Sequence, residues 1–112
     1  MQIYHNPRCR KSRETLALLQ EKGHQPEIIR YLETVPTEKE LRTVLHKLGI
    51  PAADLVRQGE ALYKEKFRGR ELTEAEWITA LVEHPRLIER PIVIRGDRAV
   101  IGRPPERVLD LL

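Results

Sequence analysis

The order of the apolar stretches at the start of the chain constrains the fold most. Residues 2–5 (QIYH) are typical of a short strand, residues from about 9 to 22 place apolar side chains at helical spacing, and residues 27–32 (EIIRYL) favour a second strand. Gly23 is suited to end the helix. A strand, a helix and a strand in this order predict two parallel strands joined by a crossover, because a tight hairpin can join only antiparallel strands.

The end of the chain predicts an antiparallel hairpin followed by a helix. Residues 91–94 (PIVI) and 98–101 (RAVI) are strand-like and flank a Gly96-Asp97 turn. Residues 104–112 (PPERVLDLL) favour a terminal helix with both prolines in its first turn, where the missing N–H groups are tolerated. The whole order is therefore β-α-β, a helical segment, then β-β-α. We expect an α/β fold with a mixed four-stranded sheet, which is the thioredoxin-like arrangement.

The middle of the chain is predicted to be helical. Thr37 and Thr73 are each followed three residues later by Glu, the capping-box pattern that opens a helix, and Gly49 is placed to end the first of these helices. Pro51 is expected at the first position of a short helical piece, and a loop is expected around Gly69. We therefore predict one thioredoxin-like domain over residues 1–112, with a helical insertion at about 34–85.

Composition excludes several classes of protein. A chain of 112 residues with 40% hydrophobic and 33% charged residues suits a single soluble domain, and no apolar run approaches the roughly 18 residues of a membrane span. The net charge of +3 is evenly spread and only 4% of residues are aromatic, which argues against nucleic-acid binding. The first residues do not form a secretory signal, so a cytoplasmic location is expected.

One cysteine lies where the first strand is predicted to become a helix. Cys9 is the only cysteine of the chain, and Arg8, Arg10 and Lys11 surround it. Free N–H groups at a helix N-terminus and nearby cations both favour a thiolate, so we expect the pKa of Cys9 to be lowered and the residue to be reactive. The alternative is a small, buried structural side chain.

The residues around Cys9 restrict its chemistry. A Cys-x-x-Cys redox pair would need a second cysteine where Ser12 stands, so a redox cycle must take its second thiol from outside, with glutathione or a partner redoxin as the obvious donors. A phosphatase-type loop has an arginine after a cysteine and five further residues, and Thr15 stands at that position here. The helix N-terminus can still bind an anion, and other arginines could complete the site or be ordinary surface charges. The four histidines are dispersed, so no metal site is indicated.

Four segments resemble one known family. HNPRCRKS (5–12), YLE (31–33), ERPIVI (89–94) and GRPPERVLDLL (102–112) are similar to the glutaredoxin-dependent arsenate reductases, in the same order and over nearly the whole chain. The resemblance implies a thioredoxin-like core with a helical insertion, in agreement with the pattern of elements.

The resemblance also implies the site residues. Cys9 matches the catalytic nucleophile of the family. The residues that match its oxyanion-binding arginines are Arg57, Arg90 and Arg103. The supporting residues it implies are His5 and Asn6 of the active-site loop, Ser12 near the thiol, and Pro91 at a position that is cis in thioredoxin-like folds.

The implied reaction is the reduction of arsenate to arsenite through an adduct of arsenate with the Cys9 thiol. Glutathione is then a co-substrate, glutaredoxin a partner, and no cofactor is bound. Two alternatives stay open at this point. One is a related thiol oxidoreductase with another substrate. The other is a transcriptional regulatory module of the Spx type, although such proteins typically carry the Cys-x-x-Cys pair that Ser12 removes here.

Overall fold

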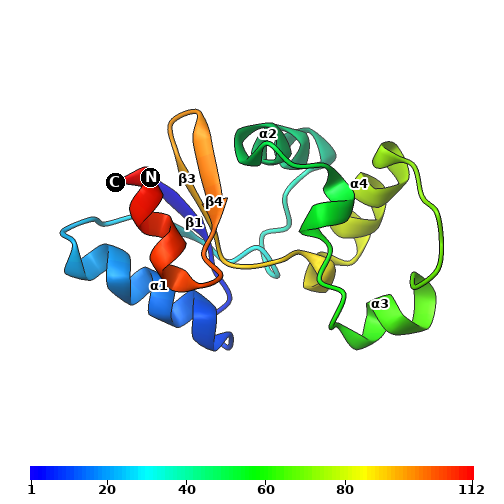
Figure 1. Cartoon of the computed structure of the whole chain (residues 1–112), viewed down its shortest axis with the longest axis horizontal. Helices are drawn as coiled ribbons and strands as arrows, with labels where there is room; N and C mark the ends of the chain where they lie inside the picture. The colour runs from blue at the N-terminus through cyan, green and yellow to red at the C-terminus, as the bar shows by residue number, and fades with distance from the viewer. The chain divides into compact units, whose positions relative to one another are not determined.

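The computed structural model describes all 112 residues, which form two compact units (Figure 1). The first unit consists of residues 1–34 and 90–112 and contains the sheet, and the second consists of residues 35–89 and is helical. No helix is both long and apolar enough to cross a membrane. The description of the chain as one domain with an insertion stays a prediction.

The sheet of the first unit has the order β2-β1-β3-β4. Its strands are β1 (Gln2–Tyr4), β2 (Glu27–Ile29), β3 (Ile92–Arg95) and β4 (Arg98–Ile101). β1 pairs in parallel with β2 and antiparallel with β3, which pairs antiparallel with β4. The predicted α/β class with a mixed four-stranded sheet is confirmed. β1 is an inner strand of the sheet, and the loop that follows it leads directly to Cys9.

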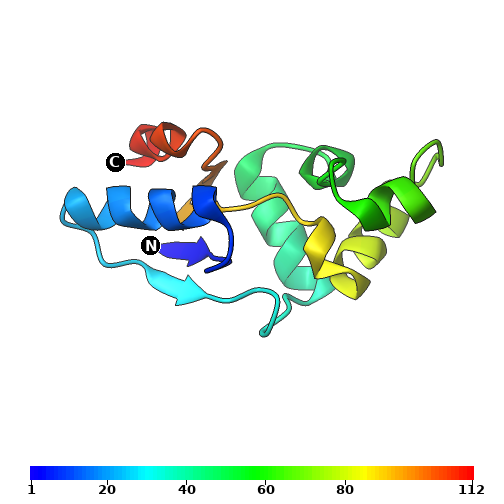
Figure 2. The same cartoon turned by 90° about the horizontal axis from the view of Figure 1, so that it is seen from below.

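Two helical elements cover one face of this sheet. Figures 1 and 2 show α1 (Arg10–Glu21) beside the 3-10 helix η3 (Pro105–Leu111). The buried core between them and the sheet is made of Ile3, Leu19, Val93, Val108 and Leu111. Burying such a side chain fully contributes about 1.5–3 kcal/mol. This packing fixes the axis of α1, and so the position of its N-terminus, against the sheet.

Two elements of this unit differ from the predictions. The second strand ends at Ile29 rather than residue 32, because the carbonyl of Arg30 accepts hydrogen bonds from the N–H groups of Glu33 and Thr34 and turns the chain. The terminal helix is a 3-10 helix rather than an α-helix, with Pro104 as its N-cap. Its bonds join residues three apart, as from the N–H of Arg107 to the carbonyl of Pro104, at 3.1 Å.

The second unit is built from three α-helices and two 3-10 helices. These are α2 (Glu38–Leu48), η1 (Ala52–Leu55), α3 (Ala61–Lys66), α4 (Glu74–Glu83) and η2 (Pro85–Leu87). Both predicted capping boxes are present, and Gly49 ends α2 with a φ of 71°. Pro51 is the N-cap of η1 and not its first helical residue, since its ψ of 160° is extended. α3 was not predicted, because its short, largely polar sequence lacks an apolar stripe.

Candidate active site

Cys9 is held at the start of α1 by a compact turn. It is the N-cap residue of the helix, and its own N–H donates to the carbonyl of Asn6 at 3.0 Å. The side-chain oxygen of Asn6 accepts a hydrogen bond from the N–H of Arg8, also at 3.0 Å. Asn6 therefore ties the loop after β1 at two points, and the thiol faces the free N–H groups of the first helical turn.

The surroundings of Cys9 favour its thiolate. Burial raises the pKa of the thiol, but the backbone N–H of Ser12, the guanidinium of Arg90 and the backbone N–H of Lys11 together lower it below its ordinary value. Hydrogen bonds to the charged form and a nearby opposite charge are two of the established ways to lower a pKa. The predicted activation of the thiol by the helix N-terminus agrees with this geometry.

The cations next to Cys9 in the sequence do not act as predicted. Arg8 and Arg10 are exposed, and Arg10 pairs with Glu14 at 2.8 Å, so solvent and a carboxylate screen them from the thiol. Lys11 contributes through its backbone N–H. The charge that lowers the pKa comes instead from Arg90, which is distant in sequence.

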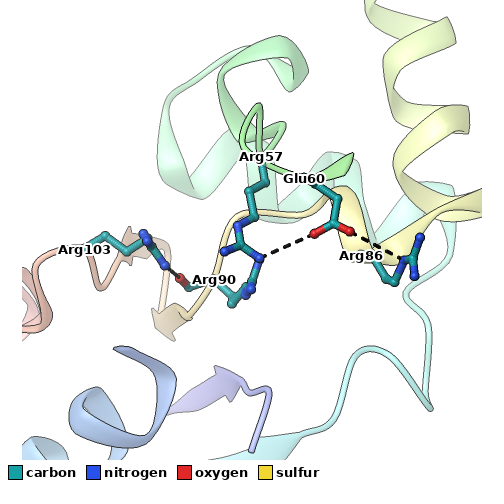
Figure 3. Close-up of polar contacts among 5 residues, drawn as sticks. All are labelled: Arg57, Glu60, Arg86, Arg90 and Arg103. Atoms are coloured by element: carbon teal, nitrogen blue, oxygen red, sulfur yellow. Dashed lines mark hydrogen bonds and ion pairs between the residues drawn. The ribbon is translucent and has the colours of Figure 1, made fainter. Parts of the chain in front are cut away.

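Arg90 is the buried cation of the site. Only 8% of its surface is exposed, and its Nε is buried without a hydrogen-bond partner. The peptide bond from Arg90 to Pro91 is cis, as is the bond from Arg103 to Pro104. Arg103 donates from Nη1 to the carbonyl of Arg90 at 3.3 Å (Figure 3). The structure thus joins Cys9, Arg90 and Arg103 in one unit, with a donor on Arg90 that the protein leaves unused.

Ser12 and His5 form a buried pair behind the loop. His5 Nδ1 and Ser12 Oγ lie 2.6 Å apart, and Ser12 Oγ also accepts from the N–H of Asn6 at 3.0 Å. Burial, followed by the charges of Arg30 and Arg13, lowers the pKa of His5, which favours neutral imidazole near pH 7. The hydroxyl of Ser12 therefore positions His5 and the backbone of Asn6. The backbone N–H of Ser12 helps to lower the pKa of the Cys9 thiol.

Arg57 lies in the second unit. It follows a bridge between Val56 and Ile88, and its own N–H donates to the carbonyl of Leu87 at 2.6 Å. Its guanidinium lies 3.5 Å from Glu60, which also lies 3.9 Å from Arg86 (Figure 3). Glu60 therefore partly neutralises Arg57 in this structure, and a role of Arg57 in anion binding stays a prediction.

Sequence reasoning missed the packing of Gly102 against α1 and Pro91. Gly102 donates its N–H to the carbonyl of Pro91 at 2.9 Å, and its carbonyl accepts from Thr15 Oγ1 at 3.4 Å. A Cβ at Gly102 would lie 2.7 Å from Thr15 Oγ1 and 2.9 Å from Pro91 Cγ. Gly102 therefore allows the segment before Arg103 to approach both the Cys9 helix and Pro91. The GRPPE motif contains this glycine, but spacing alone does not reveal its neighbours.

We expect Gly102→Ala to destabilise the protein by about 1–3 kcal/mol, because a methyl group forced into a packed site displaces its neighbours. Denaturant unfolding followed by circular dichroism measures the change in the free energy of unfolding. Thr15→Ala removes the nearest atoms, so the double variant should lose less stability than the two single losses added together. Wild-type stability in Gly102→Ala would show that the site is not tightly packed.

The alkylation rate of Cys9 should depend on pH with a midpoint below that of a free thiol. Because the folded pKa is lowered, the folded protein releases the thiol proton at a pH where the unfolded chain still holds it. The thiolate consequently stabilises the fold above the ordinary thiol pKa, and this stability is lost as pH falls through the lowered folded value. Rates with iodoacetamide between about pH 5 and about pH 9 test this, with the urea-unfolded protein as control. Equal midpoints would contradict an activated thiol.

The first unit therefore combines a thiol of lowered pKa with a buried arginine that has an unused N–H. A thiolate at a helix N-terminus next to an arginine with an unused N–H suits attack on an oxyanion whose oxygens the donors can bind. The structure contains no group of three or more His, Cys, Asp or Glu side chains arranged to hold a metal ion.

A thiol at the N-terminus of α1 beside a mixed four-stranded sheet is the arrangement of a thioredoxin-like protein. The sequence matches the ArsC family over residues 4–111, and the chain belongs to this family. It is 52% identical over 112 residues to an arsenate reductase of Haemophilus influenzae, covering 98% of this chain and 97% of that one. It is 51% identical over 114 residues to uncharacterized protein YfgD of Escherichia coli strain K12, covering 100% and 96%.

A solved structure shows the same fold. The arsenate reductase from Vibrio cholerae superposes with a TM-score of 0.95 at 49% sequence identity, and the match covers 99% of this chain and 96% of that one. The family that the sequence motifs resembled is thereby confirmed.

Proposed function

We propose that this protein is a cytoplasmic arsenate reductase that uses glutathione and glutaredoxin and binds no cofactor. The observation that carries the proposal is the buried Nε of Arg90, which has no partner, next to a Cys9 thiol with a lowered pKa. A buried donor without a partner costs about 1–3 kcal/mol, and an oxyanion held beside the thiol would accept its hydrogen bond. Relatives at 41–52% identity bear the name arsenate reductase.

In the first step, the Cys9 thiolate attacks the arsenic atom of arsenate. A sulfur–arsenic bond forms, one arsenic–oxygen bond breaks, and the oxygen leaves as water after taking up protons. Arg90 and Arg103, together with Arg57, are proposed to bind the remaining oxygens, because planar guanidinium groups pair well with tetrahedral oxyanions. The proposed role of His5, Asn6 and Ser12 is to fix the loop, and that of Pro91 is to border the site.

In the second step, glutathione supplies the second thiol. Its sulfur bonds to the sulfur of Cys9 as the sulfur–arsenic bond breaks, and the electron pair of that bond stays on arsenic and reduces As(V) to As(III). Arsenite leaves, and Cys9 is left in a mixed disulfide with glutathione. An external thiol is required because the chain has one cysteine.

In the third step, the glutaredoxin thiolate attacks the glutathione sulfur of the mixed disulfide and releases Cys9 as a thiolate. A second glutathione then regenerates glutaredoxin. The sum is arsenate and two glutathione molecules giving arsenite, oxidised glutathione and water.

A coupled assay tests the function and its coupling separately. Arsenate, glutathione and glutaredoxin are incubated with the protein, and glutathione reductase reports oxidised glutathione as NADPH consumption. We expect one NADPH per arsenate reduced and a requirement for both glutathione and glutaredoxin. No arsenate-dependent NADPH consumption would contradict the function. An undiminished rate without glutaredoxin would contradict only the coupling.

A further inference from the structure

A cavity of about 220 Å³ lies at the carboxyl ends of the two parallel strands, β1 and β2. It is lined by residues 5–8, which follow β1, and by Arg30, Leu32 and Glu33, which follow β2. The N–H of His5 donates to the carbonyl of Ile29 at 2.8 Å and so keeps the two segments together. In open α/β sheets, ligands bind in the crevice outside the carboxyl ends of the strands. The cavity lies at this end of the sheet.

The charged side chains of this cavity are not neutralised by the protein. Arg8, Arg30 and Glu33 are all exposed, and none of them takes part in the ion pairs of the structure, which involve Glu14 and Glu60. The ligand with matching chemistry therefore carries a carboxylate for the guanidinium groups and an ammonium group for Glu33.

The cavity adjoins the Cys9 loop. Arg8 immediately precedes Cys9, and Asn6, which also lines the cavity, accepts the hydrogen bond of the Cys9 N–H. Neighbouring Cα atoms are about 3.8 Å apart, so the backbone that borders the cavity continues directly into the residue that carries the thiol. A ligand held here by one end is therefore bound on the loop that leads to Cys9.

We propose that this cavity binds the γ-glutamyl end of glutathione, with its α-carboxylate at Arg8 and Arg30 and its ammonium group at Glu33. The inference rests on the proposed function, because it assigns a site to the co-substrate of that reaction. The cavity is smaller than the roughly 300–1,000 Å³ that encloses a drug-sized ligand, so it suits one end of a tripeptide. The cysteinyl residue, next along glutathione, then lies toward Cys9.

The first test measures binding without turnover. S-methylglutathione, which has no free thiol, is titrated into the Cys9→Ser protein, and affinity is followed by calorimetry and by amide NMR shifts. We expect Arg30→Gln and Arg8→Gln each to weaken binding about tenfold, the effect of losing one charge-assisted hydrogen bond. Arg98→Gln is the matched control, because it removes the same charge from the hairpin end of β4, where the Arg98 guanidinium donates to the carbonyl of Asp110 at 3.0 Å.

The second test identifies the end of the ligand that the cavity holds. S-methylated γ-glutamylcysteine keeps the γ-glutamyl group, and S-methylated cysteinylglycine lacks it. The proposal expects Arg30→Gln to weaken binding of the former about tenfold and to leave the latter unchanged, and Glu33→Gln to follow the same pattern. Equal effects on both dipeptides, or on neither, would overturn the proposal.

The two proposals fail in distinguishable ways. Binding of S-methylglutathione that depends on Arg30 supports the cavity site even if the wild-type protein does not reduce arsenate. Arsenate turnover whose KM for glutathione is the same in wild type, Arg8→Gln and Arg30→Gln overturns the cavity site and leaves the reductase intact. The absence of any S-methylglutathione binding to the Cys9→Ser protein would also overturn it.

Discussion

Cys9→Ser should lower arsenate-dependent turnover by at least about 10³-fold, the scale seen when an enzyme loses its nucleophile. A serine hydroxyl is not ionised near neutral pH, and neither the N–H groups of Lys11 and Ser12 nor the guanidinium of Arg90 can shift its pKa far enough. No other cysteine can take over, since the chain has one. The coupled NADPH assay measures this loss directly.

The control for Cys9→Ser separates chemistry from folding. Serine differs from cysteine only in its smaller side-chain oxygen and Cys9 is half-buried, so the variant should keep its circular dichroism spectrum and unfold near the wild-type temperature. Ser12→Ala is the matched comparison, because it removes a hydroxyl from the same turn and leaves the thiol in place. It should keep measurable turnover. Turnover in Cys9→Ser comparable to wild type would exclude the proposed adduct.

Several helices and strands of both units could be predicted because their signals are local. Thr37 and Thr73 form capping boxes with the glutamates that follow them, and the apolar pattern of residues 2–32 gave the parallel pair. Cys9 could be placed at a helix N-terminus for the same reason. These features depend on neighbours within one or two turns, which a single sequence displays.

The features that could not be predicted depend on residues distant in sequence. Arg90 is 81 residues from Cys9 in the chain numbering, and only the folded sheet brings its charge to the thiol. In the sequence, Arg8 and Arg10 were the expected source of the charge that lowers the pKa of Cys9. Both are exposed, and solvent screens exposed charges. Thr15 is an ordinary helix residue in the sequence, and its contact with Gly102 appears only when β4 and α1 are assembled.

Family resemblance supplied what local pattern could not. It selected Arg90 and Arg103 among all the arginines, and the structure joins both to the Cys9 unit. It also selected Arg57, whose guanidinium pairs with Glu60 in the second unit. A turnover assay of Arg57→Gln therefore tests whether Arg57 takes part in anion binding.

Arg90→Gln should weaken arsenate binding about 10–100-fold, the cost of losing hydrogen bonds to a charged group, and should raise the pKa of Cys9 toward its ordinary value. Both effects follow from one buried guanidinium that lowers the pKa of the thiol and has an unpartnered Nε. Protection of Cys9 from iodoacetamide by arsenate measures the first effect, and the pH dependence of alkylation without arsenate measures the second.

Arg90→Lys separates the charge of Arg90 from its shape. An ammonium group keeps the positive charge but lacks the planar set of donors that binds two oxygens at once, so Arg90→Lys should retain much of the lowered pKa of Cys9 and lose most of the arsenate affinity. Arg95→Lys is the matched control, because Arg95 ends β3, the strand that follows Arg90, and donates to the carbonyl of Leu111 at 2.9 Å. If Arg90→Gln alkylates and binds arsenate like the wild type, Arg90 neither activates the thiol nor holds the oxyanion.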